Sequence, residues 1–310
     1  MGGHLWLELA KLMNIFLVCA GIVFITKCTQ SQLIDFIIIL GIVSSVRAEW
    51  TYSSQMYETG VMFLYVCAVV WTLEKRKTRL SLLLAGIAYL VRPELLLFGI
   101  VTVALSVYRS KGYWSGLGLA VLSFIPMALY HLYMQVYSGD WIPSSIVARL
   151  YTSLEDPSWL NRFGTSLRGS SPLGVAVFLV FVVISILSVF LRRFHGIRPM
   201  AFLGFPLVFL YALLPPRDDV LRYLLPSLPI CVLAIYKAIS ALNLRWAAVP
   251  ITLGISLWFL WSNHARNDPA KYETMQLLGN DLSTALDSIA KKEDLVLVYE
   301  IQFQYSLACR

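Results

Sequence analysis

The sequence predicts an all-α polytopic membrane protein of about ten transmembrane helices, followed by a small α/β segment outside the membrane. The first observation is composition: of 310 residues, 58% are hydrophobic and only 14% are charged, and the mean hydropathy is +0.70. Soluble domains carry about 25% charged residues. The second observation is that apolar runs alternate with loops of two different charge characters, which is typical of a chain that crosses a bilayer repeatedly.

Ten apolar runs make up the predicted transmembrane domain, residues 1–262. They lie at about 5–26, 32–46, 58–73, 80–91, 94–107, 117–137, 172–191, 199–214, 223–240 and 247–262. Several are shorter than the ~20 residues that a helix needs to cross a bilayer. The run 80–91 would rise only ~18 Å as a helix. Because non-helical backbone at membrane depth is tolerated where it lines a cavity, these short runs predict a water-filled recess.

One set of loops is strongly basic and the other is mixed in sign. The basic set holds eleven cations and a single acid, Glu74. The cations are Lys27, Lys75, Arg76, Lys77, Arg79, Arg109, Lys111, Arg192, Arg193, Arg198 and Arg245. The positive-inside rule makes this set cytoplasmic and the mixed set, which includes residues 92–93 and 138–171, extracytoplasmic. Loop position therefore explains the net charge of +7, and no nucleic-acid partner is predicted.

Both termini are predicted to be extracytoplasmic. The tail, residues 263–310, contains an amphipathic helical pattern from Leu278 to Ile289 and a buried-strand pattern from Leu295 to Tyr299. A lone helix and strand make a poor domain, so we expect the tail to be truncated. An extracytoplasmic N-terminus with no preceding span also indicates a fragment, or a first helix that inserts in reverse.

Cysteine and histidine patterns indicate neither a disulfide framework nor a metal site. The five cysteines form no CxxC pair, and the four histidines are scattered along the chain. Three of the cysteines lie inside apolar runs, where cysteine usually packs as a small hydrophobic residue. The sequence predicts no particular cofactor, and binding of a divalent cation is an open alternative.

Four polar groups fall on the predicted outer side. They are Trp50–Gly60, which contains Glu58; Arg92-Pro93-Glu94; Gly139–Arg149, which contains Asp140; and Arg217–Tyr223 with Arg222, followed by Leu224-Leu225-Pro226. Ionisable residues at membrane depth are costly and usually mark functional sites. For Arg92-Pro93-Glu94, a tight turn at the water boundary is the simpler alternative.

Arginine suits phosphate because its planar group donates two hydrogen bonds at once and stays charged. Arg92, Arg149, Arg217 and Arg222 are therefore candidate ligands of a lipid phosphate. Arg222 and Tyr223 could instead anchor the chain at the interface, and Arg149 could extend from a surface helix toward water. Asp218 and Asp219 are more simply solvated loop residues, and Asp35 and Lys237 are most simply boundary residues.

The order and spacing of these groups resemble the integral-membrane glycosyltransferases of the GT-C superfamily, which use polyprenyl-phosphate sugars. The resemblance is to the branch that includes bacterial arabinofuranosyltransferases and covers about Trp50 to Arg310. Glu58-Thr59 matches the end of a Ser-Gly-Leu-Glu-Thr motif, and Arg92-Pro93-Glu94 matches fully. Gly139, Asp140, Pro143 and Ala148 match the third motif, where Ser144-Ser145 replaces Asn-Thr and Arg149 replaces Lys. Arg222-Tyr223-Leu224-Leu225-Pro226 also matches fully.

The resemblance implies transfer of a sugar from a polyprenyl-phosphate donor, with inversion, to a glycan, lipid or protein acceptor of the cell envelope. The implied location is the outer face of a bacterial inner membrane. Its implied substrate-binding residues are Glu58, Arg92, Glu94, Asp140, Arg149, Arg222 and Tyr223. Members of the family carry a catalytic acid in the first outer loop, and this chain begins after that point. The catalytic base is therefore expected upstream of Met1.

Two alternatives remain open. A secondary transporter also carries intramembrane charges, but such proteins often contain inverted repeats, and the two halves of this chain show no internal similarity. A non-catalytic partner of a glycan polymerase or flippase would fit an absent catalytic loop equally well. Transfer of a labelled sugar, or uptake without transfer, separates these classes.

Overall fold

A computed structural model describes residues 2–29, 32–45, 59–92, 95–109, 113–139, 172–204 and 225–266. Within these residues the structure is all-helical, with no strand. The elements are α1 (Gly2–Thr26), α2 (Gln32–Ser45), α4 (Thr59–Glu74), α5 (Thr78–Gly86), α6 (Ala88–Val91), α7 (Leu96–Tyr108), α8 (Tyr113–Ser123), α9 (Ile125–Ser138), α12 (Pro172–Phe190), η2 (Arg192–Ile197), η3 (Leu225–Ser227), α15 (Leu228–Ala241) and α16 (Arg245–Arg266).

The helices coincide with the predicted apolar runs as far as these are described. Two runs are interrupted: 80–91 divides into α5 and α6 at Ile87, and 117–137 bends between α8 and α9 at Phe124. Proline in the first turn of α9 accounts for the second break, because its ring cannot continue the preceding helix. The predicted helix and strand of the tail lie outside the described residues. The all-helical prediction is confirmed for the described part alone.

Two described helical segments are long and apolar enough to cross a membrane. They are Leu9–Thr26 and Gly116–Tyr137, the second of which spans α8 and α9. Five further apolar helices contain between 10 and 17 residues. These lengths agree with the short apolar runs of the sequence, whereas the crossing of a bilayer by all ten runs remains a proposal.

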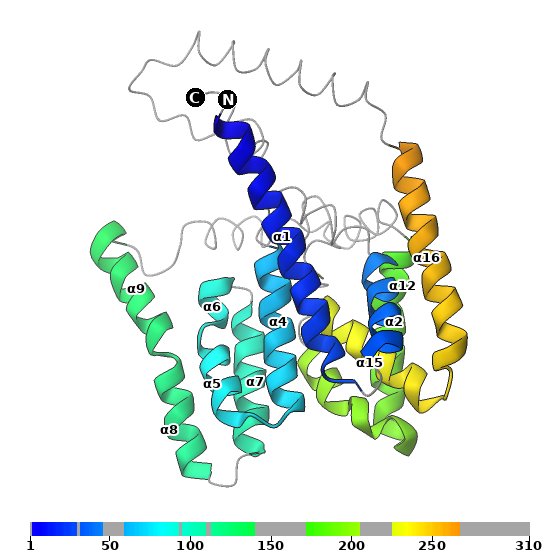
Figure 1. Cartoon of the computed structure of the whole chain (residues 1–310). Coiled ribbons are helices and arrows are strands. Elements are labelled where there is room, and N and C mark those ends of the chain that lie inside the picture. The colour runs from blue at the N-terminus through cyan, green and yellow to red at the C-terminus, as the bar shows by residue number, and fades with distance from the viewer. Residues whose placement is uncertain are drawn as a thin grey trace, which may run out of the picture. The chain divides into compact units, whose positions relative to one another are not determined.

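The chain divides into two units, Ala10–Ser256 and a second that joins Met1–Leu9 to Leu257–Arg310. The hydrophobic core of the first unit is formed by side chains of α1, α2, α4, α12 and α15, with Phe63 and Phe181 fully buried. In this unit α4 contacts α5 and α15, α5 contacts α7 and α8, and α12 contacts α15 (Figure 1). The contacts therefore join helices close in sequence, such as α4 and α5, and helices far apart in sequence, such as α4 and α15.

Several helices approach one another so closely that only glycine fits between them. A Cβ atom added at Gly86 of α5 would lie 1.7 Å from the carbonyl oxygen of Ser123 in α8. At Gly99 of α7 it would lie 2.7 Å from the carbonyl oxygen of Ala85. Small residues that let backbones meet are typical of helix packing in membranes.

The outward faces of the helices are apolar. Phe190 of α12 is 77% exposed and Val136 of α9 is 80% exposed, and both belong to a larger set of exposed Leu, Ile, Val and aromatic side chains on α8, α9, α12 and α16. Soluble monomers rarely expose contiguous apolar patches of more than a few hundred Å². Contact with lipid hydrocarbon would remove the free-energy cost of exposing these apolar side chains to water.

Cations gather at one end of the bundle, which we call the basic end. There Lys237 of α15 forms an ion pair with Glu74 of α4 at 2.7 Å. Arg109, which follows α7, donates to the carbonyl oxygen of Leu73 at 3.0 Å. Arg193 similarly donates to the last carbonyl of α15, that of Ala241. Cations near the C-terminal ends of helices are stabilised by the unsatisfied carbonyl groups there.

Candidate functional site

Arg92 lies at the opposite end of the bundle from the basic end. It follows α6 in an extended conformation, with φ of −163° and ψ of 131°. The residue after it in the sequence is Pro93, and a residue before proline is disfavoured in the helical region, which explains why α6 ends here. Despite its charge, Arg92 is only 8% exposed. One of its Nη atoms lies 3.8 Å from the Sδ atom of Met62.

The contact with Met62 places Arg92 beside the first turn of α4. Helix α4 begins at Thr59, so the end of the Glu58-Thr59 motif and the start of the Arg92-Pro93-Glu94 motif lie close together. The short helix η3, which contains the last residues of the Arg-Tyr-Leu-Leu-Pro motif, also contacts α4 and leads into α15. Because α15 ends beside Glu74 at the basic end, its beginning and η3 lie toward the Arg92 end.

Helix α9 leads to the third motif. It ends at Gly139, which has a positive φ of 79° and closes the helix through a hydrogen bond from its amide to the carbonyl oxygen of Gln135. A positive φ favours glycine, which has no Cβ atom to clash. Helix α9 contacts α6, the helix that precedes Arg92. The described residues next to each of the four motifs therefore lie toward the same end of the bundle, opposite the basic end.

Aromatic rings from α6 and α9 pack near this end. The ring of Tyr89 lies 4.8 Å from that of His131 and 6.1 Å from that of Tyr130, measured between centroids. The sequence favours a boundary or packing role for His131, and its aromatic contacts agree with packing. Farther along α9, Tyr133 and Tyr137 stack at 5.6 Å and are both exposed. Exposed tyrosines of this kind are typical of membrane interfaces.

Of the seven residues predicted to bind substrate, the structure describes Arg92. The other six lie outside the described residues: Glu58, Glu94, Asp140, Arg149, Arg222 and Tyr223. Their assignment therefore stays a prediction. Among the described residues, no group of three or more His, Cys, Asp or Glu side chains is arranged to hold a metal ion.

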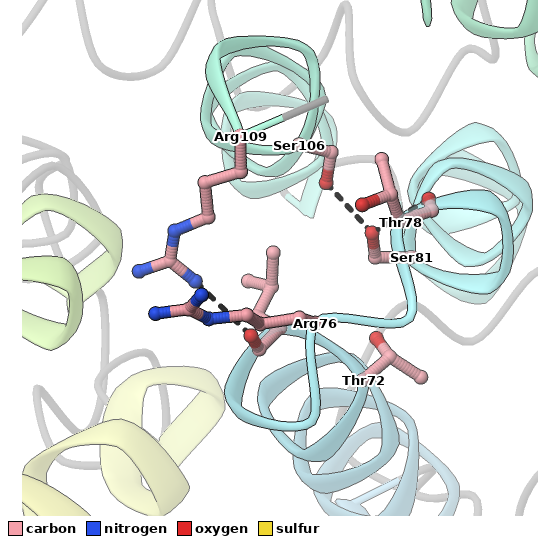
Figure 2. Close-up of a pocket in the computed structure, with 7 residues that line it drawn as sticks. Thr72, Arg76, Thr78, Ser81, Ser106 and Arg109 are labelled. Atoms are coloured by element: carbon pink, nitrogen blue, oxygen red, sulfur yellow. Dashed lines mark hydrogen bonds between the residues drawn. The ribbon is translucent and has the colours of Figure 1, made fainter. Parts of the chain in front are cut away.

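A second polar feature, absent from the sequence predictions, is a small hollow at the basic end, which we call the basic pocket. It lies where α4 ends, α5 begins and α7 ends (Figure 2). Its polar lining residues are Thr72, Arg76, Thr78, Ser81, Ser106 and Arg109. From the sequence alone, Arg76 and Arg109 indicate only that their loops are cytoplasmic. Nothing in the linear pattern shows that these two arginines, 33 positions apart by their numbers, meet in space.

Asp35 and Lys237, both interpreted from the sequence as boundary residues, take different positions. Asp35 lies in the first turn of α2, near a helix end as expected, but its side chain is fully buried. Glu74, the single acid of the basic loops, is held by Lys237. Lys237 also donates to the carbonyl oxygen of Gly196 at 3.3 Å, so this cation links α4, η2 and α15.

Comparison with known protein families, with curated proteins and with solved structures gives no match for this chain. The function is therefore inferred from the residues and their geometry.

Cys28, in the turn after α1, is expected to react slowly with thiol reagents. Burial raises the pKa of its thiol to about 12, and the nearby Glu74 carboxylate adds to this, with smaller opposing effects from Lys237 and Lys75. The reactive form is the thiolate, so labelling of the folded protein at pH 8 should be at least about a hundredfold slower than for an ordinary thiol. The rate should still increase between pH 9 and 11. Peptide mapping after maleimide labelling measures it.

The denatured protein is the control for this experiment, because its Cys28 should label with the pH dependence of a free thiol. Equal labelling rates in the folded and denatured protein at pH 8 would show that the thiol is not buried as described.

Proposed function

We propose that this chain is a polytopic membrane glycosyltransferase that moves a sugar from a polyprenyl-phosphate donor to a cell-envelope glycan, lipid or protein on the extracytoplasmic face. In this proposal all ten apolar runs cross the bilayer of the cell membrane. The apolar exterior of the helices and the close glycine contacts support an environment of lipid. The gathering of cations at one end supports a cytoplasmic position for that end.

The observation that carries the proposal is the buried Arg92 beside the first turn of α4. Burying a guanidinium is costly unless anionic or polar groups compensate for it. A surface turn would leave such a side chain in water. Its burial, together with helix ends that lead into three other polar motifs, supports a functional site at this end of the bundle.

The mechanism follows from the charge of the leaving group. In the transition state the bond between the anomeric carbon and the phosphate oxygen breaks, and negative charge grows on the polyprenyl phosphate. Arginines fixed around that phosphate would stabilise the charge. We assign this role to Arg92, Arg149 and Arg222, with Tyr223 beside them at the interface.

The acidic residues take supporting roles in the proposal. Glu58, Glu94 and Asp140 would orient the arginines or accept hydrogen bonds from sugar hydroxyl groups. Inverting transfer also needs a base that removes the proton of the acceptor hydroxyl. We assign that role to no residue of this chain. None of the assigned roles requires a divalent cation.

Donor binding tests the proposal directly. The full chain in lipid nanodiscs should bind a polyprenyl-phosphate sugar, and Arg149→Ala and Arg222→Ala should each weaken binding about tenfold or more, because each removes charge-assisted hydrogen bonds to phosphate. Lys75→Ala, an exposed cation at the basic end, is the matched control and should bind normally. Unchanged affinity in both arginine variants would reject the assignment.

Sugar transfer and solute uptake separate this function from its alternatives. A labelled sugar should pass from the polyprenyl phosphate to an acceptor glycan. Uptake of solute into proteoliposomes without any transfer would favour a secondary transporter. Donor binding without transfer or uptake would favour a partner of a glycan polymerase or flippase.

A further inference from the structure

The basic pocket has no role in the proposed transfer reaction, because it lies at the other end of α5 and α6 from Arg92. Three segments build it. The end of α4 supplies Thr72, the start of α5 supplies Thr78 and Ser81, and the end of α7 supplies Ser106 and Arg109. The hydroxyl groups of Ser81 and Ser106 lie 2.7 Å apart and share a hydrogen bond that joins α5 to α7. This hydrogen bond connects two of the helices that line the pocket.

The turn between α4 and α5 holds Arg76 in an unusual conformation. Its φ is +54°. The amide of Lys77 donates to the carbonyl oxygen of Thr72, and that of Arg76 to the carbonyl oxygen of Leu73. This pair of bonds forms a Schellman motif, in which glycine or asparagine is usual at the left-handed position. Asn243 takes that position after α15. Arginine is disfavoured there by its backbone preference.

The two arginines of the pocket bring more hydrogen-bond donors than the described residues accept. Both side chains line the same hollow, Arg76 from the turn after α4 and Arg109 from the end of α7 (Figure 2). Arg109 donates to the carbonyl oxygen of Leu73. Among the described residues, no hydrogen bond or ion pair is found for the side chain of Arg76. The neighbouring acid Glu74 is already held by Lys237.

Two cations that line one hollow repel each other, and an anion bound between them would remove this repulsion. The amides at the start of α5 favour negative charge, whereas the C-terminal ends of α4 and α7 favour the arginines themselves. Thr78 adds a hydroxyl group at the same place. The nearby side chain of Lys77 is held over the ring of Trp71 at 4.3 Å, which leaves the two arginines as the principal charged donors.

The dimensions of the pocket suit a small tetrahedral anion at its mouth. Its interior has room for about one water molecule, whereas the empty space including the open mouth is about 150 Å³. A phosphate group at the mouth would meet both guanidinium groups and the start of α5. Phosphate has enough oxygen atoms to accept from several of these donors at once, and planar guanidinium groups bind it bidentately.

We propose that the basic pocket is a phosphate-binding site, formed by Arg76, Arg109 and the start of α5. Its ligand is a phosphate group, either free in solution or on the headgroup of an anionic phospholipid. The site is independent of the proposed glycosyl transfer. It would also hold the ends of α4, α5 and α7 together, since each contributes to the pocket.

Phosphate binding by the full chain tests the proposal in two arms. The first measures binding of radiolabelled inorganic phosphate to protein in neutral detergent by equilibrium dialysis. The second compares retention of phosphatidic acid and phosphatidylcholine from mixed nanodiscs by native mass spectrometry. Each arm uses Arg76→Asn, which suits the left-handed turn, and Arg109→Gln. Arg79→Gln, an exposed cation of the same segment outside the pocket, is the matched control.

We expect Arg76→Asn and Arg109→Gln each to weaken phosphate binding about tenfold or more, and Arg79→Gln to leave it within about twofold, since exposed charges act weakly. Saturable binding of inorganic phosphate supports a soluble ligand. Retention of phosphatidic acid without binding of inorganic phosphate supports a lipid headgroup.

Two results would overturn the proposal. One is the absence of any preference for phosphate in both arms. The other is an equal loss of binding in Arg79→Gln, which would show that the basic end attracts anions only through its overall charge. Arg76→Asn is expected to keep the thermal stability of the protein, so a loss of binding in that variant is not explained by unfolding.

Discussion

Gly86→Ala should lower the stability of the protein more than any conservative exchange on its surface. A Cβ atom at this position would lie 1.7 Å from the carbonyl oxygen of Ser123, which belongs to the backbone and cannot rotate away. Helices α5 and α8 would have to separate, and overpacking of this kind costs about 3 kcal/mol. Thermal unfolding of the purified protein in detergent measures the effect as a reduced midpoint.

Gly118→Ala is the matched control, because Gly118 lies on α8 and a Cβ atom there would meet no atom within 4 Å. Alanine has a higher helix propensity than glycine by about 1 kcal/mol, so this variant should be as stable as the parent or slightly more stable. A Gly86→Ala protein with unchanged stability would show that α5 and α8 do not meet as closely as described.

Arg92→Lys should abolish most donor binding while it keeps the positive charge. Lysine is a compact ammonium on a flexible stem and cannot replace the planar, bidentate guanidinium. If Arg92 holds the donor phosphate, its replacement should weaken binding of polyprenyl phosphate by about tenfold or more. Titration of polyprenyl phosphate into the nanodisc-reconstituted protein measures the dissociation constant.

Arg192→Lys provides the control, because Arg192 is an exposed cation in η2 at the basic end. Its donor binding should match that of the parent. If Arg92→Lys binds the donor with unchanged affinity, Arg92 does not contact the phosphate, and its burial beside Met62 would need a purely structural explanation.

Much of the helical arrangement could be predicted from hydrophobic runs. Apolar length and flanking charge located α1, α2, α4 and α7 within a few residues, because a continuous apolar segment between a basic loop and a loop of mixed sign has few alternatives to a helix. The breaks at Ile87 and Phe124 were not predicted. The proline two residues after Phe124 is a sequence signal for the second break, whereas the break at Ile87 lies in apolar sequence without proline.

The candidate site was less predictable, for two different reasons. Arg92 was identified because a charge inside an apolar run is a visible exception, and the structure adds that it is buried beside Met62. The basic pocket was missed because Arg76 and Arg109 looked ordinary in loops that membrane topology already made basic. Their meeting depends on the packing of α4, α5 and α7, and on the left-handed turn at Arg76, neither of which appears in the linear sequence.

The division of one apolar run into α5 and α6 has a consequence for the surrounding lipid. Helix α5 contains 9 residues and α6 contains 4, so with Ile87 between them the pair extends about 21 Å, well short of a ~30 Å hydrocarbon layer. In a membrane, the bilayer beside this pair would have to become thinner or the outer ends of α5 and α6 would lie below the headgroups. If the bilayer becomes thinner there, the headgroups of the two leaflets lie closer together along α5 and α6 than elsewhere around the protein.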